Sequence, residues 1–138
     1  MDKWDVRFCE LAKFVSEWSK DPSAKVGAVV FSKRGGDVSI GYNGFPMGVE
    51  DSAERLEDQE MKLELVVHAE QNALIAAGSR SAGSTLYVWG KPICARCAGS
   101  IIQAGAWFRE LTSTIQRFPH LNQQVSHHHQ LTLKVSTH

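Results

Sequence analysis

Four side chains in this sequence could together perform metal-assisted chemistry. His68 supplies an imidazole, and Cys94 and Cys97 supply two thiols at the spacing Cys-x-x-Cys. Zinc accepts this set of ligands, and three protein ligands leave the fourth tetrahedral position open for water. Glu70 lies two residues after His68, so its carboxylate can reach such a water without binding the metal. The sequence therefore predicts a zinc site with an adjacent general base.

Each half of this pattern also has a simpler interpretation. A Cys-x-x-Cys pair alone fits a redox pair or half of a zinc ribbon, and a His-x-Glu triplet is common at a helix start. The third cysteine, Cys9, lies beside the apolar stripe of the first predicted helix, which argues against a fourth ligand closing a structural site. Both halves stand at predicted helix starts, where partial positive charge favours thiolate and hydroxide. The combination therefore favours a catalytic site over chance.

The elements that must position these residues follow from apolar periodicity. Spacings of four and three predict a first helix, ended before Pro22, with Asp5 off its apolar stripe. That stripe consists of Trp4, Phe8, Leu11, Val15 and Trp18. Residues 50–64 are acidic and predict a solvated loop or a short helix. The other predicted elements are a hairpin of strands over 25–32 and 38–42, a shaped loop over 43–48, helices over 69–77 and 95–104, and strands over 83–89 and 131–135.

Length, charge and cysteine count limit the class of protein. A chain of 138 residues is expected to form a single domain, 1–138, with a real core. Lys+Arg and Asp+Glu are both 15, and this zero net charge argues against a nucleic-acid partner. The sequence shows no membrane-spanning run and no signal peptide, so a cytoplasmic location is expected. Three cysteines cannot all pair, which argues against a disulfide framework.

The chain resembles the cytidine deaminase superfamily and, within it, the deoxycytidylate (dCMP) deaminases. His-x-Glu followed by Cys-x-x-Cys is similar to the signature of zinc-dependent deaminases. The resemblance implies an α/β fold of three layers, α-β-α, around a mixed central sheet of about five strands. The segments that carry it are SKDPS at 19–23, VGAV at 26–29, GYNGFP at 41–46 with Gly48, HAEQNA at 68–73, TLYV at 85–88 and IIQAG at 101–105.

The resemblance also implies a role for each residue of the predicted site. His68, Cys94 and Cys97 would hold Zn²⁺, and Glu70 would move protons. Backbone amides near Ala69 and Cys94 would polarise the water and the pyrimidine carbonyl.

A second group of residues would bind the nucleotide. Asn43 is similar in position to the residue that meets the sugar, and Gly44 would let the backbone approach the ligand closely. Ser19 and Lys20 match positions near the phosphate, where a lysine serves as a point charge. The alternatives are a turn asparagine that tolerates a positive φ for Asn43 and a solvated lysine at a helix end for Lys20.

The implied activity is hydrolytic deamination of a cytosine nucleotide, with dCMP and water giving dUMP and ammonia. One alternative is a related zinc deaminase that acts on another nucleotide, nucleoside or base. Another is a catalytically inactive zinc-binding module. The resemblance further implies a homo-oligomer, and it makes dCTP and dTTP candidate effectors.

The chain departs from the family pattern in two regions. Ile93 stands between Pro92 and Cys94, where the family has proline next to the cysteine. Residues 106–138 diverge from the family, so the resemblance assigns no fourth or fifth strand. Three consecutive histidines at 127–129 cannot easily aim at one ion from a strand, which favours a surface loop over a second metal site.

Overall fold

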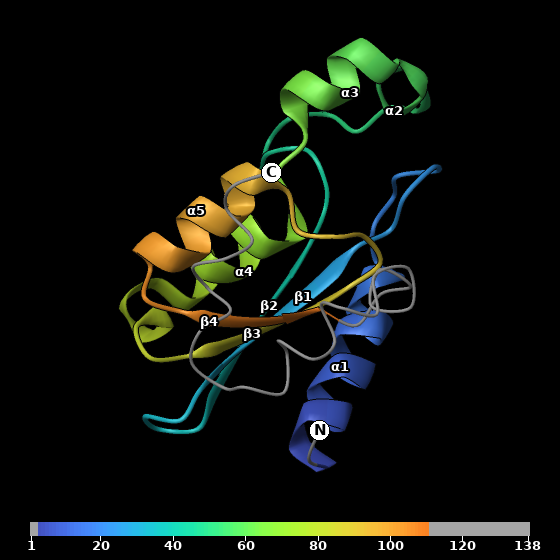
Figure 1. Ribbon diagram of the computed structural model, residues 1–138. Helices are drawn as coiled ribbons and strands as arrows, with labels where there is room; N and C mark the ends of the chain where they lie inside the picture. Colours follow the sequence, from blue (N-terminus) through green and yellow to red (C-terminus); the bar gives the residue numbers. More distant parts are fainter. Residues whose placement is uncertain (1–2, 111–138) are drawn as a thin grey trace.

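The computed structural model describes residues 3–110, which form one mixed sheet with helices on both faces (Figure 1). The strand order is β2-β1-β3-β4. β1 (Gly27–Ser32) pairs antiparallel with β2 (Asp37–Tyr42) and with β3 (Thr85–Trp89). β3 pairs parallel with β4 (Trp107–Glu110), and the chain between these two strands contains a helix. The predicted α/β fold with a mixed sheet is therefore confirmed.

The two faces of the sheet carry different helices. α1 (Lys3–Ser16) packs on one face, and α4 (Ala69–Ala77) and α5 (Ala95–Gln103) pack on the other. Successive side chains of a strand point to opposite faces. In β1, Ala28 joins the core beneath α4 and α5, and Val29 joins the core beneath α1. One central strand thus supplies both cores, and the three predicted layers are present.

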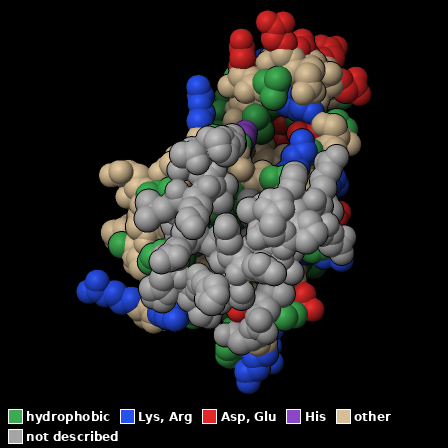
Figure 2. Space-filling model, in the orientation of Figure 1, with side chains coloured by type: hydrophobic (Ala, Val, Ile, Leu, Met, Phe, Trp, Pro, Cys, Tyr) green, Lys and Arg blue, Asp and Glu red, His purple; other side chains and the backbone are tan. Residues whose placement is uncertain are grey.

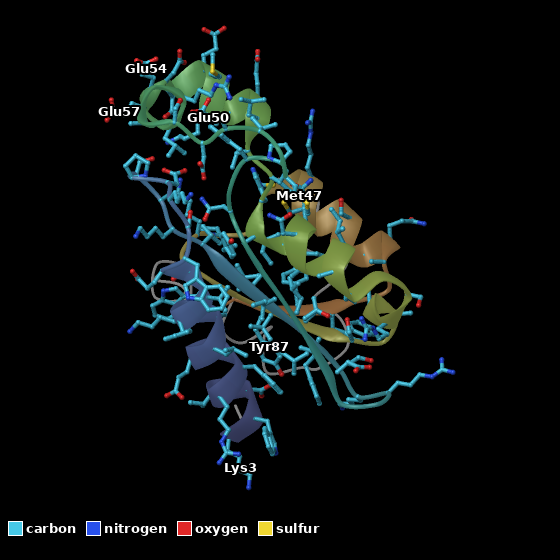
Figure 3. All side chains as sticks on the ribbon, turned by 180° about the vertical axis from the view of Figure 1, so that it is seen from behind. Lys3, Met47, Glu50, Glu54, Glu57 and Tyr87 are labelled. Atoms are coloured by element: carbon cyan, nitrogen blue, oxygen red, sulfur yellow. The ribbon has the colours of Figure 1, made fainter. Side chains whose placement is uncertain are left out.

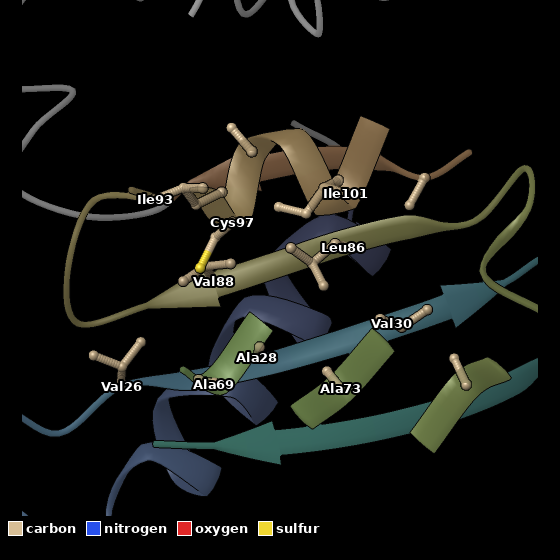
Figure 4. Close-up of a cluster of buried hydrophobic side chains, with 13 residues drawn as sticks. Val26, Ala28, Val30, Ala69, Ala73, Leu86, Val88, Ile93, Cys97 and Ile101 are labelled. Atoms are coloured by element: carbon tan, nitrogen blue, oxygen red, sulfur yellow. The ribbon is translucent and has the colours of Figure 1, made fainter. Parts of the chain in front are cut away.

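Small residues bring α4 close to the sheet (Figure 4). Ala69 and Ala73 of α4 are fully buried. A Cβ atom on Gly41 of β2 would collide with backbone atoms of these two residues. The Asn72 side chain donates a hydrogen bond to the Tyr42 carbonyl at 2.8 Å. The first turn of α4, where the predicted site lies, is therefore held by close backbone packing.

The buried face of α1 differs from the predicted apolar stripe. Phe8 is buried as expected, but Trp4 is 51% exposed, and Trp18, which was expected in the helix, follows the end of α1 and is 47% exposed. Asp5, expected off the stripe, is buried and accepts a hydrogen bond from the Tyr87 hydroxyl at 2.8 Å. A buried carboxylate needs such a partner. Tyr87 is distant in sequence, so apolar spacing alone could not reveal it.

Residues 50–65, here named the α2–α3 lobe, project from the sheet as two short helices (Figure 1). α2 (Ala53–Glu57) and α3 (Gln59–Leu65) begin after Ser52 and Asp58. These two side chains accept hydrogen bonds from backbone N–H groups one turn on, as helix caps do. Acidic side chains gather on the lobe, as Figures 2 and 3 show. The predicted helical alternative for this segment is therefore correct, with two helices instead of one.

The strand β4 lies at the start of the divergent segment, so a fourth strand is present. The described residues contain four of the about five strands expected. The strand predicted over 131–135 and the histidines at 127–129 lie outside the described residues. Within residues 3–110, no helix is long and apolar enough to cross a membrane.

Candidate active site

The first and second predicted ligands stand directly before two helices on the same face of the sheet. His68 precedes α4, and its backbone N–H donates to the Gln71 side chain at 3.0 Å. Cys94 is the N-cap of α5, and its Sγ accepts from the Cys97 N–H at 3.4 Å. Ile93, the residue that departs from the family pattern, is buried in the core beneath these helices. The helix starts therefore fix the backbone of both ligands.

The structure brings His68, Cys94 and Cys97 together. Their ligand atoms all lie within 4.8 Å of one another. His68 Nδ1 is 3.1 Å from Cys97 Sγ and 3.5 Å from Cys94 Sγ. Ligands around a tetrahedral zinc ion are separated by roughly 3.5 to 3.8 Å. One imidazole and two thiols at these separations fit a zinc ion with little movement.

The electrostatics of the cluster also fit a bound cation. Burial raises the pKa of the Cys97 thiol, and Cys94 and the charge of Glu70 raise it further. Thiolates are the form that binds metal, so ionisation of the Cys97 thiol is favoured by a compensating positive charge. A divalent ion supplies that charge, and the two helix N-termini add to it.

Glu70 occupies the second position of α4 and is 4% exposed. Its charge acts on Cys97, which places the carboxylate in the electrostatic environment of the ligand cluster. Ala69, between Glu70 and His68, is fully buried. The N-cap and the first two residues of α4 thus place the His68 imidazole, the Ala69 backbone amide and the Glu70 carboxylate in succession at one helix start.

The residues predicted to bind nucleotide divide into two places. Gly44 pairs with Val67 through two backbone hydrogen bonds, which puts it beside the residue that precedes His68. The Asn43 side chain accepts from the Val26 N–H and donates to the Ala24 carbonyl, both at 2.8 Å. These bonds fix the loop, and Asn43 does not have the positive φ that the alternative of a turn asparagine supposed.

Ser19 and Lys20 are neighbours in sequence but differ in environment. Ser19 is buried and donates from Oγ to the Asn43 carbonyl at 2.9 Å. The Lys20 ammonium is exposed and forms an ion pair with Asp51 of the α2–α3 lobe at 2.9 Å. Ser19 therefore belongs to the frame of the loop at 43–44, whereas Lys20 extends toward the lobe.

Sequence reasoning missed Lys62 and Asp21. Lys62 is the one buried residue of α3, and its ammonium pairs with Asp21 at 3.3 Å. The one available signal was a lysine within a strongly acidic segment, and that signal does not name a partner 41 residues away.

An imidazole and two thiols converging beside a buried carboxylate define a zinc-dependent hydrolytic centre, because three ligands leave one position for water. Fold and centre agree with a match over residues 2–110 to the family model described as the cytidine and deoxycytidylate deaminase zinc-binding region. The chain belongs to this zinc-binding deaminase family.

Individual relatives agree with the family match. The chain is 44% identical over 105 residues to an uncharacterized deaminase of Aliivibrio fischeri, covering 76% of this chain and 69% of that one. It is 39% identical over 111 residues to mouse deoxycytidylate deaminase, covering 75% and 61%. The chain thus spans less than two thirds of the mouse protein.

A solved structure extends the comparison to the fold. The dCMP deaminase of cyanophage S-TIM5, in complex with dCMP and dUMP, superimposes with a TM-score of 0.63 at 26% identity. The match covers 89% of this chain and 93% of that chain. This similarity agrees with the fold of the described residues, 3–110.

Proposed function

We propose that this chain catalyses the hydrolytic deamination of a cytosine nucleotide, with dCMP and water giving dUMP and ammonia. The observation that carries the proposal is the His68, Cys94 and Cys97 cluster beside the buried carboxylate of Glu70. The similarity to a dCMP deaminase solved with dCMP and dUMP supports the choice of nucleotide.

We assign His68, Cys94 and Cys97 as the ligands of one zinc ion. Zinc, when bound, lowers the pKa of a water toward neutrality and so makes a nucleophile available. Glu70 would take a proton from the attacking water and pass it to ring N3 of the cytosine as the water oxygen bonds to C4. Glu70 would then take the remaining proton from the C4 hydroxyl and give it to the amino group, so that the C4–N bond breaks, ammonia leaves and the C4 oxygen becomes the carbonyl of uracil.

We assign the nucleotide contacts to the second group of residues. Asn43 and Gly44 would present the loop at 43–44 to the sugar, with Ser19 holding the Asn43 carbonyl in place. Lys20 would meet the phosphate by leaving its exposed pair with Asp51, which is weak in water. The Ala69 amide at the start of α4 would stabilise negative charge on the reacting groups.

We further propose a single domain over residues 1–138, a cytoplasmic location and a homo-oligomeric state. dCTP and dTTP are the effectors that family membership makes worth testing. The zero net charge continues to argue against a nucleic-acid partner.

An ammonia-release assay on zinc-loaded protein tests the central proposal. The substrates are dCMP, CMP, deoxycytidine and cytosine at matched concentrations. We expect the highest kcat/KM for dCMP, because the 5′-phosphate adds binding that the nucleoside lacks. Equal values for dCMP and deoxycytidine would replace the nucleotide assignment with a nucleoside deaminase. Full zinc content without ammonia from any substrate would indicate a noncatalytic zinc module.

A further inference from the structure

The α2–α3 lobe is anchored by a buried charge. Its helices contribute no residue to either hydrophobic core, and Lys62 is their one buried side chain in the described structure. The Lys62 ammonium donates to Ser23 Oγ at 2.6 Å and to Asp21 Oδ1 at 3.3 Å. Burying an ammonium is unfavourable unless it is paired and hydrogen-bonded, so the position of the lobe depends on this contact.

The partner of Lys62 is a turn at residues 21–24, here named the Asp21 turn. Asp21 Oδ1 also accepts from the Ser23 N–H at 2.8 Å, the Ser23 hydroxyl at 2.9 Å and the Ala24 N–H at 3.2 Å. Burial by itself raises the pKa of Asp21, but these bonds and Lys62 outweigh it and leave the pKa below its ordinary value. The Asp21 turn is therefore an ionised acceptor that Lys62 docks onto.

Hydrogen bonds also connect the Asp21 turn to the loop at 43–44, which is proposed to bind the nucleotide. Ala24, whose N–H completes the turn, offers its carbonyl to the Asn43 side chain at 2.8 Å. Ser19, at the other end of the turn, donates to the Asn43 carbonyl at 2.9 Å. A shift of the turn is thus transmitted directly to Asn43.

The contacts close into a ring that includes the residue before the first zinc ligand. Gly44, next to Asn43, forms two backbone hydrogen bonds with Val67, of 2.8 and 3.2 Å. Val66 bonds back to the Lys62 carbonyl at 2.9 Å and ends α3. The ring therefore runs from the Lys62 side chain through the Asp21 turn, the loop at 43–44 and Val67 back to α3.

We infer that Lys62 is a positioning residue, which sets the loop at 43–44 for the nucleotide through the Asp21 turn. The inference rests on the proposed function, because it concerns binding of the same substrate. Removing the ammonium opens the ring at one side-chain contact. The proposed zinc ligands lie at the starts of α4 and α5, and the core beneath these helices contains no lobe residue, so we expect the ligands to keep their places. Substrate binding is weakened while the metal site and the chemical step are preserved.

The test compares Lys62→Met, which keeps length but removes charge and donors, with Lys62→Arg, which keeps the charge. Ser23→Ala removes the nearer acceptor from the other side of the contact. Lys33→Met, at an exposed position in the turn between β1 and β2, is the matched control. Zinc content, KM and kcat for dCMP, and cleavage of the lobe by a glutamate-specific protease are measured on each protein.

We expect Lys62→Met to retain its zinc, to raise KM for dCMP by about tenfold, the size of one hydrogen bond to a charged group, and to change kcat far less. Protease cleavage of the lobe should become faster. Ser23→Ala should show a smaller rise in KM, Lys62→Arg should recover part of the loss, and Lys33→Met should match the wild type.

Two results would overturn the inference. Faster cleavage with an unchanged KM would mean that Lys62 holds the lobe without positioning the substrate loop. Loss of zinc in both Lys62→Met and Ser23→Ala would mean that the contact supports the whole fold. A wild-type protein that does not convert dCMP would instead refute the proposed function, and the inference with it.

Discussion

Two regions of the molecule are held by opposite means. One is the face of the sheet that carries α4 and α5, here named the α4–α5 face, and the other is the α2–α3 lobe. On the α4–α5 face, fully buried side chains such as Ala69, Ala73 and Ile101 pack directly on the strands. The lobe buries no apolar side chain in the described structure, and its anchor is the polar contact of Lys62 with the Asp21 turn.

This difference matters because the two means of support have different tolerances. Close packing permits almost no displacement, which suits ligands that must converge on one ion. A charged contact can break and re-form without disturbing a core, which would suit a segment beside the proposed nucleotide loop. The ligand cluster and the lobe are thus supported by different kinds of contact.

Replacing Glu70 with Gln should have the largest effect. The effect should be confined to the rate of the reaction and should not reach the packing of the α4–α5 face. Gln keeps the shape of the side chain but cannot move protons, so kcat for dCMP should fall by on the order of 10² to 10⁴. Zinc content and melting temperature should stay unchanged. Glu10→Gln, at an exposed position of α1, is the matched control. A Glu70→Gln protein that keeps more than about a tenth of its kcat would contradict the assigned role.

Replacing Cys97 with Ser should remove most of the bound zinc, because a serine hydroxyl does not ionise as a ligand. Elemental analysis should find about one zinc per wild-type chain. Cys9→Ser removes a thiol from the core beneath α1 and should keep the metal. Full zinc retention by Cys97→Ser would mean that another residue completes the site.

Replacing Gly41 with Ala tests the packing that supports α4. The added Cβ would collide with the backbone of Ala69 and Ala73, so we expect the free energy of unfolding to fall by about 1 to 3 kcal/mol. Gly99→Ala meets open space in α5 and should raise it by up to about 1 kcal/mol. Urea denaturation of zinc-loaded protein measures both. Equal stabilities would show that the close approach of β2 and α4 is not required.

Acid should produce the smallest effect, and it should act on the lobe contact. The pKa of Asp21 lies below its ordinary 3.8 in the folded protein. A lowered folded-state pKa gives stability that is present above the unfolded value and is lost as pH falls through the folded value. The stability advantage of wild type over Asp21→Asn should therefore shrink as the pH is lowered below about 4. An advantage that persists in acid would show that the charge of Asp21 is not what stabilises the contact.

Local signals in the sequence were enough to predict the elements around the ligands. The helix over 69–77 has its predicted bounds, and α5 ends one residue short of its predicted end. The family and its zinc chemistry were also predicted, because His68, Cys94 and Cys97 have a spacing that few other sites share. The roles of Glu70 and of the nucleotide contacts stay predictions.

Long-range polar partners explain what could not be predicted. The burial of Asp5 depends on the Tyr87 hydroxyl, and the burial of Lys62 depends on Asp21. Each partner lies on a separate element, and no periodicity encodes the pairing. The two lobe helices did leave a local trace in their caps, Ser52 and Asp58, which mark helix starts.

The backbone bridge between Gly44 and Val67 also bears on how this chain can change over time. It brings together the two ends of the stretch from 45 to 66, so this stretch forms a closed insertion between β2 and α4. Closing such a loop depends weakly on its length, at about 0.6 kcal/mol for each doubling. We therefore expect insertions and deletions there to leave the sheet, α4 and α5 in place. Residues 45–66 could therefore be replaced by another segment, provided that a lysine still reaches the Asp21 turn. Such a replacement would alter substrate choice around an unchanged metal centre.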